Sequence, residues 1–340
     1  NAVPALVGSG SSLSFGASGP SQPAGNYSVL VTGAPGGCTA SQSFTIIAAA
    51  SPTVSIAGSN LLCPGATNIL NAIATAGSGS ISGYQWYNPA IILGATGDQY
   101  PASTAGNYTV QVTNTYNCTT TSNPVFNLAM DNSPMHGLYP ISPAPVSCTN
   151  FQSFDSAFSS LNRRGIDASV VFDVSPGLVE TAPSNGLRLG SLTLNPSVGA
   201  FTILFHSAGG GPIPLIKAQN PGTSLGIVSI SGVDNVSFDQ IDLIDENTDV
   251  TTSVRWGYGL FKYSASDGVQ NNTISNCNII LNGANTTTVN GILMPGSTGI
   301  LLSNSTVALP GNALTGVTSA NSNNKFYGNT ISNVNTGIYI

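Results

Sequence analysis

The last third of the chain, residues 228–340, carries a short apolar pattern that recurs with no helical periodicity between its copies. Each copy has its characteristic side chains at the first, fourth and sixth positions, and asparagine or serine lies close to them. The copies begin at Phe238, Ile274, Leu302 and Phe326. Alternation with a period of two predicts short strands, with Asn, Ser and Gly in the turns. Such a strand cannot bury its apolar face alone, so we expect stacked coils, as in a parallel β-helix.

The shared spacing also predicts which side chains stack inside these coils. The four first positions form one expected column. The middle positions form a second column at a turn or bend, made of Ile241, Cys277, Ser305 and Asn329. The third column consists of Leu243, Ile279, Val307 and Ile331. We therefore expect Cys277 to be a thiol that faces the core.

The first third of the chain contains a different repeat. Residues 25–47 and 106–128 both read Gly-Asn-Tyr, an alternating strand, a turn with a cysteine, and a second strand. Residues 50–130 hold about seven short alternating segments separated by turn residues, which is the pattern of a β-sandwich module. Residues 1–49 then correspond to the closing part of an earlier module. The half-module at the start and a strand at Ile340 lead us to expect a fragment of a longer polypeptide, truncated at the C-terminal end.

The composition limits the partners of the chain. Charged residues make up 6% of the sequence, against roughly 25% in an ordinary domain. The net charge of -6 and the lack of a basic patch argue against nucleic acid and anionic lipid as partners. No apolar run approaches the ~20 residues that cross a bilayer, so we expect no membrane insertion.

The junction between the two repeats is rich in proline. Residues 131–147 include Pro134, Pro140, Pro143 and Pro145 and are expected to form a stiff, extended linker. The β-helix is then expected to occupy residues 148–340. Aromatic and leucine side chains at helical spacing follow the linker, at Phe151, Phe154, Phe158 and Leu161. They predict an N-terminal helix that caps the open end of the coils.

Two stretches resemble known families. Residues 268–280 and 323–340 look like pectate-lyase-like right-handed β-helix repeats, and residues 154–177 resemble the cap and first coil of such domains in large surface proteins of gliding bacteria. The motifs Leu62-Cys-Pro-Gly65, Tyr84-Gln-Trp-Tyr87 and Gly106-Asn-Tyr-Thr-Val110 resemble Ig-like or PKD-like repeats, which occur in tandem in type IX-secreted adhesins. The resemblance implies an all-β fold of Ig-like sandwich modules followed by a right-handed parallel β-helix.

The Ig-like resemblance also implies a disulfide. Cys63, Trp86 and Cys118 follow one another in the order in which such sandwiches place a tryptophan against an inter-sheet disulfide. A bond between Cys63 and Cys118 would stabilise the module by about 4 kcal/mol and imply an oxidising, extracellular setting. The alternative is a pair of free buried thiols. The partner of Cys38 would precede Asn1, and Cys148 has no evident mate.

The β-helix resemblance directs attention to acidic residues, because pectate-lyase-like folds bind polysaccharide with acids that hold calcium or act as acid and base. Asp239, Asp242 and Asp245 are the candidates for a calcium or glycan contact. The alternative is a solvated face. Asn247-Thr-Asp249 matches one motif of polygalacturonase-like enzymes, but their paired aspartates, Gly-His-Gly and Arg-Ile-Lys are missing. The acid and base pair needed for hydrolysis is therefore incomplete.

Other candidate side chains are isolated. His136 and His206 have no second His or Cys at the spacing of a zinc site, so we expect both to be structural. Asp155-Ser156-Ala157 fits the short motif on which the resembling bacteria attach O-glycans, which makes Ser156 a candidate modification site.

Together these features predict a non-catalytic structural or adhesive segment of a long extracellular cell-surface protein or filament. No cofactor is implied, although calcium remains open, and the expected partners are an extracellular glycan or surface, or other copies of the protein. The alternative is a polysaccharide-active β-helix enzyme, lyase-like or hydrolase-like, with Ig-like accessory modules. The two differ in one requirement, because only the enzyme needs a convergent charged site.

Overall fold

The computed structural model describes residues 24–33, 37–63, 65–144, 147–219, 226–247, 254–283, 297–306 and 320–340. Strands dominate these ranges, as the sequence predicts, and several of the sheets are parallel. The chain divides into two compact units, one of residues 1–60 and 68–128 and the other of residues 61–67 and 129–340. Within the ranges described, no helix has the length and apolar character needed to cross a membrane.

Two antiparallel sheets make up most of the first unit. One sheet contains, in spatial order, β3 (Thr53–Ala57), β5 (Asn68–Thr75) and β8 (Gln99–Ala102). The other contains β7 (Ala90–Ile91), β6 (Ile81–Asn88), β9 (Gly106–Asn114), which also pairs with β10 (Thr119–Thr121), and β11 (Phe126–Met130). Leu70, Trp86 and Tyr108 are fully buried, and the Tyr100 ring lies 5.8 Å from both the Trp86 and the Tyr108 rings. Aromatic side chains from both sheets therefore share one core.

A separate hairpin repeats part of this unit. It consists of β1 (Gly25–Thr32) and β2 (Thr39–Ile46), in which Tyr27 is paired with Phe44. In the same way, β9 pairs Tyr108 with Phe126 of β11. In both hairpins the residue after the phenylalanine also bonds the residue before the tyrosine, Thr45 to Asn26 and Asn127 to Asn107, each at 2.8 Å. The sequence repeat is thus a repeat of one hairpin structure.

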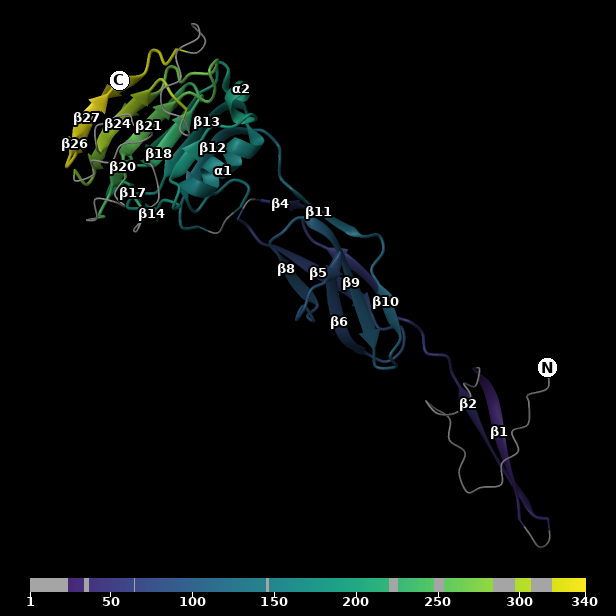
Figure 1. The fold of residues 1–340 in the computed structure, drawn as a ribbon. Coiled ribbons are helices and arrows are strands. Elements are labelled where there is room, and N and C mark those ends of the chain that lie inside the picture. Colours follow the sequence, from purple (N-terminus) through teal and green to yellow (C-terminus); the bar gives the residue numbers. More distant parts are fainter. Residues whose placement is uncertain are drawn as a thin grey trace. The chain divides into compact units, whose positions relative to one another are not determined.

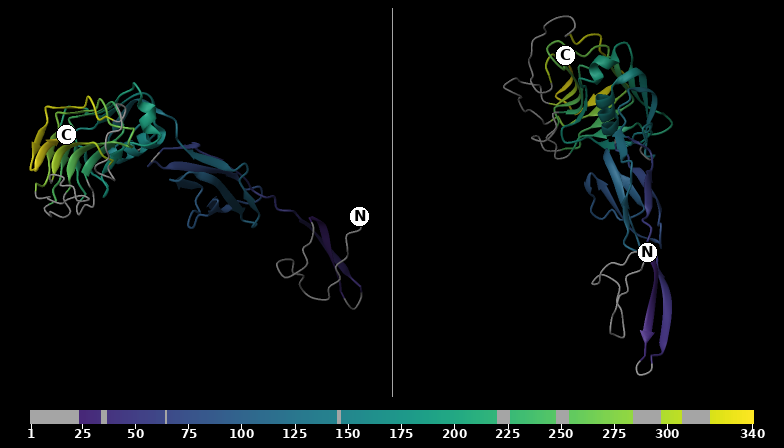
Figure 2. Two further views of the ribbon diagram at one scale, coloured as in Figure 1. Left: turned by 45° about the horizontal axis from the view of Figure 1, so that its top comes forward. Right: turned by 90° about the vertical axis from the view of Figure 1, so that its right-hand side faces the viewer.

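The second unit is built from three parallel sheets, and each successive turn of the chain, or coil, adds one strand to each sheet (Figures 1 and 2). The first sheet is β12 (Met135–Ile141), β13 (Ile166–Val174), β16 (Ile203–Ser207), β19 (Val236–Asp239), β22 (Thr273–Ser275) and β25 (Lys325–Tyr327). The second sheet is β14 (Val179–Thr181), β17 (Leu215–Lys217), β20 (Asp242–Ile244), β23 (Asn278–Ile280) and β26 (Thr330–Ser332). The third sheet is β15 (Leu187–Leu189), β18 (Gly226–Ser231), β21 (Trp256–Phe261), β24 (Thr298–Ser303) and β27 (Thr336–Tyr339). This topology is compatible with the parallel β-helix that the sequence predicts.

The predicted columns are correct in part. Ile274 pairs with Phe238 on one side and Phe326 on the other, and Ile279 pairs in the same way with Leu243 and Ile331. Ile241 and Cys277 are buried at the bend between the first and second sheets, and the side-chain oxygen of Asn329 at the next bend accepts a hydrogen bond from the Cys277 N–H at 3.0 Å. The core-facing position of Cys277 is therefore confirmed.

Leu302 and Ser305 do not belong to these columns, so that prediction is wrong. Leu302 lies in β24 of the third sheet, where it pairs with Leu260, and the backbone oxygen of Ser305 accepts a bond from Lys262. The reason is coil length: equivalent residues are 36 apart between Val236 and Asn272 but 52 apart in the next coil. A short apolar pattern looks alike in any of the three sheets. Val307 lies outside the described residues.

Asparagine has a defined role at the bends of the second unit. Asn235, Gln240, Asn271, Asn276, Asn323 and Asn333 all adopt positive φ between 54° and 57°. Asparagine tolerates this left-handed conformation better than most residues, because its short polar side chain can bond the nearby backbone. Further asparagines connect coils, as where Asn272 bonds the backbone of Val236 and Val233.

The proline-rich junction differs from the predicted linker. Residues 135–141 form β12, which pairs in parallel with β13 and buries Met135 and Ile141. Pro140 is accommodated because β12 is the edge strand of its sheet, where a missing N–H costs no ladder bond. The second unit therefore begins before the linker ends, rather than at residue 148.

The predicted N-terminal helix is confirmed as α1, which spans Phe154–Arg164 and buries Phe154, Phe158 and Leu161. The Phe158 ring lies 5.2 Å from the Phe205 ring, which in turn stacks on Phe238 at 4.8 Å. The helix thus packs on the aromatic column inside the coils. A second, short helix, α2, spans Leu194–Val198.

Candidate functional site

The three predicted acidic residues lie close together along one coil, at and beyond the bend between the first and second sheets. Asp239 ends β19, and its Oδ1 accepts hydrogen bonds from Ser275 Oγ at 2.8 Å and Asn276 Nδ2 at 2.7 Å. Asp242 begins β20, and its two oxygens accept from the backbone and side-chain nitrogens of Asn278 at 2.7 and 3.0 Å. Both carboxylates therefore bond the next coil.

Asp245 follows β20 and is buried. Its two oxygens accept hydrogen bonds from the backbone N–H groups of Asn247 at 3.0 Å and Val254 at 2.8 Å. Burial raises the pKa of Asp245, although these two bonds oppose the rise. The carboxylate thus holds together the two ends of the segment between residues 247 and 254.

A calcium contact at these three residues stays a prediction, although their carboxylates are already engaged. Each of the three carboxylates is bonded to its own set of N–H or O–H donors, and in the part of the chain that the structure describes no three His, Cys, Asp or Glu side chains are placed to hold a metal ion. Neither a calcium contact nor the alternative of a solvated face predicts the hydrogen bonds of Asp239 and Asp242 to polar residues of the next coil. Thr248 and Asp249 of the Asn-Thr-Asp motif lie outside the described residues.

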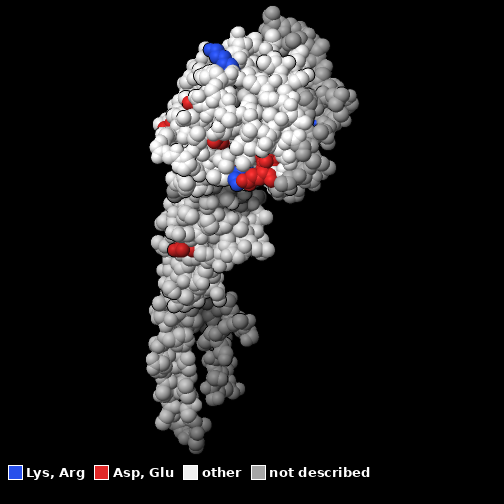
Figure 3. Space-filling model, turned by 90° about the vertical axis from the view of Figure 1, so that its left-hand side faces the viewer, with Lys and Arg blue, Asp and Glu red and all other residues white. Residues whose placement is uncertain are grey.

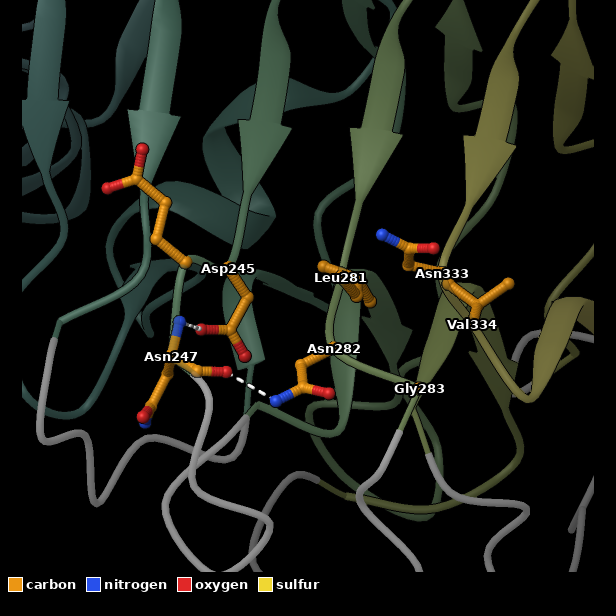
Figure 4. Close-up of a pocket in the computed structure, with 8 residues that line it drawn as sticks. Asp245, Asn247, Leu281, Asn282, Gly283, Asn333 and Val334 are labelled. Atoms are coloured by element: carbon orange, nitrogen blue, oxygen red, sulfur yellow. Dashed lines mark hydrogen bonds between the residues drawn. The ribbon is translucent and has the colours of Figure 1, made fainter.

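A polar hollow of about 460 Å³ lies where β20, β23 and β26 end, and it is lined by residues 245–247, 281–283 and 333–334 (Figure 4). The Asn282 side chain donates a hydrogen bond to the backbone oxygen of Asn247. Glu246 is paired with Lys217 at 2.8 Å. Amides and carboxylates of this kind can hydrogen-bond the hydroxyl groups of a carbohydrate, so a glycan contact at Asp245 stays a prediction.

The structure also brings together side chains that the sequence analysis kept apart. Asp173, His206 and Asp239 occupy in-register positions on three successive strands of the first sheet. His206 Nε2 lies 2.5 Å from Asp173 Oδ1, and Nδ1 lies 3.1 Å from the Ser207 carbonyl oxygen. Both ring nitrogens therefore lie beside an oxygen that can accept a hydrogen bond.

The sequence contains a pattern that predicts this alignment of Asp173, His206 and Asp239. Each of the three strands contains a buried phenylalanine followed by a polar residue: Phe172-Asp173, Phe205-His206 and Phe238-Asp239. Aligning the phenylalanines, whose rings stack at 4.4 and 4.8 Å, would have aligned the polar residues as well. The other histidine, His136, pairs with Asp167 at 2.8 Å on the exposed surface.

The predicted disulfide between Cys63 and Cys118 is wrong. Cys63 is bonded to Cys148, with their Cα atoms 4.9 Å apart, and both belong to the second unit. Cys118 is a half-buried free thiol in the turn between β9 and β10, and Cys38 is an exposed one. The residue of β9 that lies opposite Trp86 is Val110, so the strand register leaves Cys118 beyond the buried core.

Trp86 is accordingly not packed on a Cys63–Cys118 bridge. Its indole N–H donates to the Gly97 carbonyl oxygen at 2.9 Å, and its ring lies against Tyr100. Cys277 is the third free thiol among the described residues, and burial raises its pKa to about 11. It therefore stays protonated and unreactive at neutral pH.

Ser156, the candidate for O-glycosylation, lies in the first turn of α1 and is half-buried. Its hydroxyl donates to the Ser153 carbonyl oxygen at 2.8 Å, and its N–H donates to Ser153 Oγ at 3.1 Å. Attachment of a glycan would break the first of these bonds but not the second. The modification stays a prediction.

Comparison with known proteins gives no further guide, because the chain matches no protein-family model and no curated protein. What these residues can do must be inferred from their geometry.

Proposed function

We propose that this chain is a structural or adhesive segment of a long extracellular cell-surface protein or filament, and that it is not an enzyme. In this proposal Ig-like modules provide length, and a right-handed parallel β-helix provides a regular lateral surface. Its partners are an extracellular glycan or surface, or other copies of the same protein.

The first unit supports the Ig-like part of the proposal. A three-stranded and a larger antiparallel sheet enclose the buried Trp86, as in Ig-like sandwiches. Tyr108 lies near the start of β9, and its hydroxyl donates to the Thr104 carbonyl oxygen at 2.7 Å. This bond matches the tyrosine corner of such domains, in which a tyrosine hydroxyl bonds the backbone a few residues upstream. The repeated hairpin at β1 and β2 supports a tandem array.

The observation that carries the proposal is that polar side chains of the second unit form hydrogen bonds between coils. Asp239, Asp242 and Asn272 all bond atoms of a neighbouring coil. These bonds hold coils in register, and they leave these side chains fewer acceptors for a substrate. Bonded carboxylates and amides of this kind suit a stable surface better than a catalytic centre.

The sparsely charged surface supports the proposed partners, and the disulfide supports the proposed extracellular location. Figure 3 shows one face on which charged side chains are few and most of the described surface is uncharged. A surface of this kind suits contact with neutral glycans or with itself, because it exerts little long-range charge repulsion. The Cys63–Cys148 bond supports an oxidising compartment, such as the outside of the cell.

One observation favours the alternative of a polysaccharide-active enzyme. Asp173 and Asp239 lie two strands apart, roughly 9–10 Å across the sheet, with His206 between them. Paired carboxyl groups in inverting glycosidases are separated by about 6.5–9.5 Å. Against this, Asp239 already accepts two hydrogen bonds and His206 is bound to Asp173. Both carboxylates are therefore already engaged and are not free to act as a catalytic acid or base.

A polygalacturonate assay separates the two functions. We expect the protein with calcium to release no product above a protein-free blank, because the acidic side chains serve coil stacking. The Asp239→Ala, Asp242→Ala double variant should instead lower the melting temperature. Co-sedimentation with the polymer, or self-association that rises with concentration, would support an adhesive role. Steady product release that is abolished by Asp173→Asn or by the double variant would establish the enzyme instead.

A further inference from the structure

One bend of the second unit, between the third and first sheets, holds two acidic side chains on successive coils. Asp234 lies between β18 and β19, and its Oδ1 accepts a hydrogen bond from the Gln270 N–H at 2.7 Å. Asp267 lies between β21 and β22, and its Oδ2 accepts from Asn195 Nδ2 at 3.0 Å. Asn195 belongs to α2 of the preceding coil and also donates to the Ser231 carbonyl oxygen at 3.1 Å. Three successive coils therefore meet at this bend.

The groups at this bend are tightly packed. Gly232, two residues before Asp234, adopts φ +66°, and a Cβ atom there would lie 2.6 Å from Asp267 Oδ2 and from Asn195 Nδ2. The Asp267 carboxylate is thus pressed against the backbone of the strand end that carries Asp234. A larger residue at position 232 has no room.

Within the ranges that the structure describes, no ion pair joins either carboxyl group to a Lys, Arg or His side chain. The ion pairs of the described residues join Arg164 to Asp131, Lys217 to Glu246, and the two histidines to Asp167 and Asp173. The side-chain and backbone groups that bond the two acids are neutral, namely the Asn195 side chain and the Gln270 amide, and Tyr263 Cβ packs against position 232. Both acids lie at the same half-buried bend on successive coils, with Asp267 Oδ2 against position 232, so ionisation of both places two like charges at one bend.

We propose that Asp234 and Asp267 form a pH-dependent clasp between three successive coils, which loosens when both carboxyl groups are ionised and tightens when one takes up a proton. A single proton removes the repulsion between the like charges. It also removes the cost of keeping the second charge in a partly desolvated place. The Asn195 and Gln270 donors hold both groups in position in either state.

The pKa values agree with this geometry. Burial raises the pKa of Asp234 from 3.8 to about 6, the Gln270 bond opposes the rise, and Asp267 adds to it. Burial also raises the pKa of Asp267. Because the folded value for Asp234 exceeds the unfolded one, the folded protein binds this proton more tightly. The contribution to stability is complete below about pH 4 and is lost as the pH rises through about 6.

A carboxyl titration by NMR tests the clasp directly. In the full chain labelled with ¹³C-aspartate, we expect the Asp234 carboxyl to titrate near pH 6. In Asp267→Asn it should titrate at lower pH, because the neighbouring charge that raises its pKa is gone. A wild-type Asp234 that titrates near pH 4, or a titration that Asp267→Asn leaves unchanged, overturns the proposal.

Thermal unfolding gives a second readout. The melting temperature of the second unit should rise between pH 7.5 and 5, and the rise should be smaller in Asp234→Asn, whose amide is neutral at both values. Asp98→Asn, which changes an exposed carboxylate of the first unit, serves as the control and should keep the wild-type rise. An equal rise in Asp234→Asn and wild type would contradict the clasp.

Discussion

Replacing Ile279 by aspartate is expected to unfold the second unit or to lower its stability by several kcal/mol. Ile279 is fully buried and is paired with Leu243 and Ile331 on the two neighbouring coils. The substitution removes an apolar side chain from a packed core, which costs about 2–5 kcal/mol, and it introduces a carboxyl group with no partner. For a unit of this size, the melting temperature should fall by roughly 10 °C or more.

The adjacent residue provides the matched control. Ile280 belongs to the same strand but faces the opposite way and is 37% exposed. Ile280→Asp should therefore cost less than about 1 kcal/mol. Thermal unfolding of both variants is the measurement, and similar melting temperatures for the two would show that the interior and exterior of this strand are wrongly assigned.

The second large effect concerns the buried ion pair between α1 and the start of the second unit. Arg164 Nη2 lies 3.2 Å from Asp131 Oδ2, and the two side chains are only 5% and 9% exposed. Arg164 Nε also donates to the Ser133 carbonyl oxygen at 2.6 Å. Arg164→Met should cost about 3–5 kcal/mol, because it removes the ion-pair partner of a buried carboxylate.

Two further variants separate this cause from lost packing. The Asp131→Asn, Arg164→Met double variant should be more stable than Arg164→Met alone, since it removes the stranded charge. Lys217→Met breaks the exposed pair with Glu246 and should cost less than about 1 kcal/mol. Denaturant unfolding gives the values, and an Arg164→Met variant as stable as Lys217→Met would refute a stabilising role for the buried pair.

The sequence predicted those parts of the fold that local periodicity encodes. The alternation around Phe238 and Ile274 was sufficient to predict stacked strands. The helical spacing of Phe154 and Phe158 was sufficient to predict α1. Coil length was not predictable, because the 52-residue coil places Leu302 in another sheet with the same apolar pattern. Periodicity identifies a strand but does not identify its neighbours.

Long-range pairing explains the other errors. The cysteine prediction relied on order along the chain, whereas the bond to Cys148 depends on which segments meet in the second unit. Because residues 131–147 are rich in proline, they were predicted to be a linker, although Met135, Tyr139 and Ile141 are buried in a strand. In the candidate site, the positions of Asp239 and Asp242 along the coil were predicted, but their bonds to Asn276 and Asn278 required the register of the next coil.

The most direct test of the coil arrangement is a cross-link between residues 52 positions apart. Thr273 and Lys325 are paired in β22 and β25 and lie on the outward face, so Thr273→Cys with Lys325→Cys should form a disulfide with ordinary Cα spacing. The control combines Thr273→Cys with Leu301→Cys, which would be neighbours if Leu302 stacked on Ile274. Non-reducing peptide mapping should find the first cross-link in high yield and not the second. Cross-linking of position 273 to position 301 instead would contradict the three-sheet arrangement of coils.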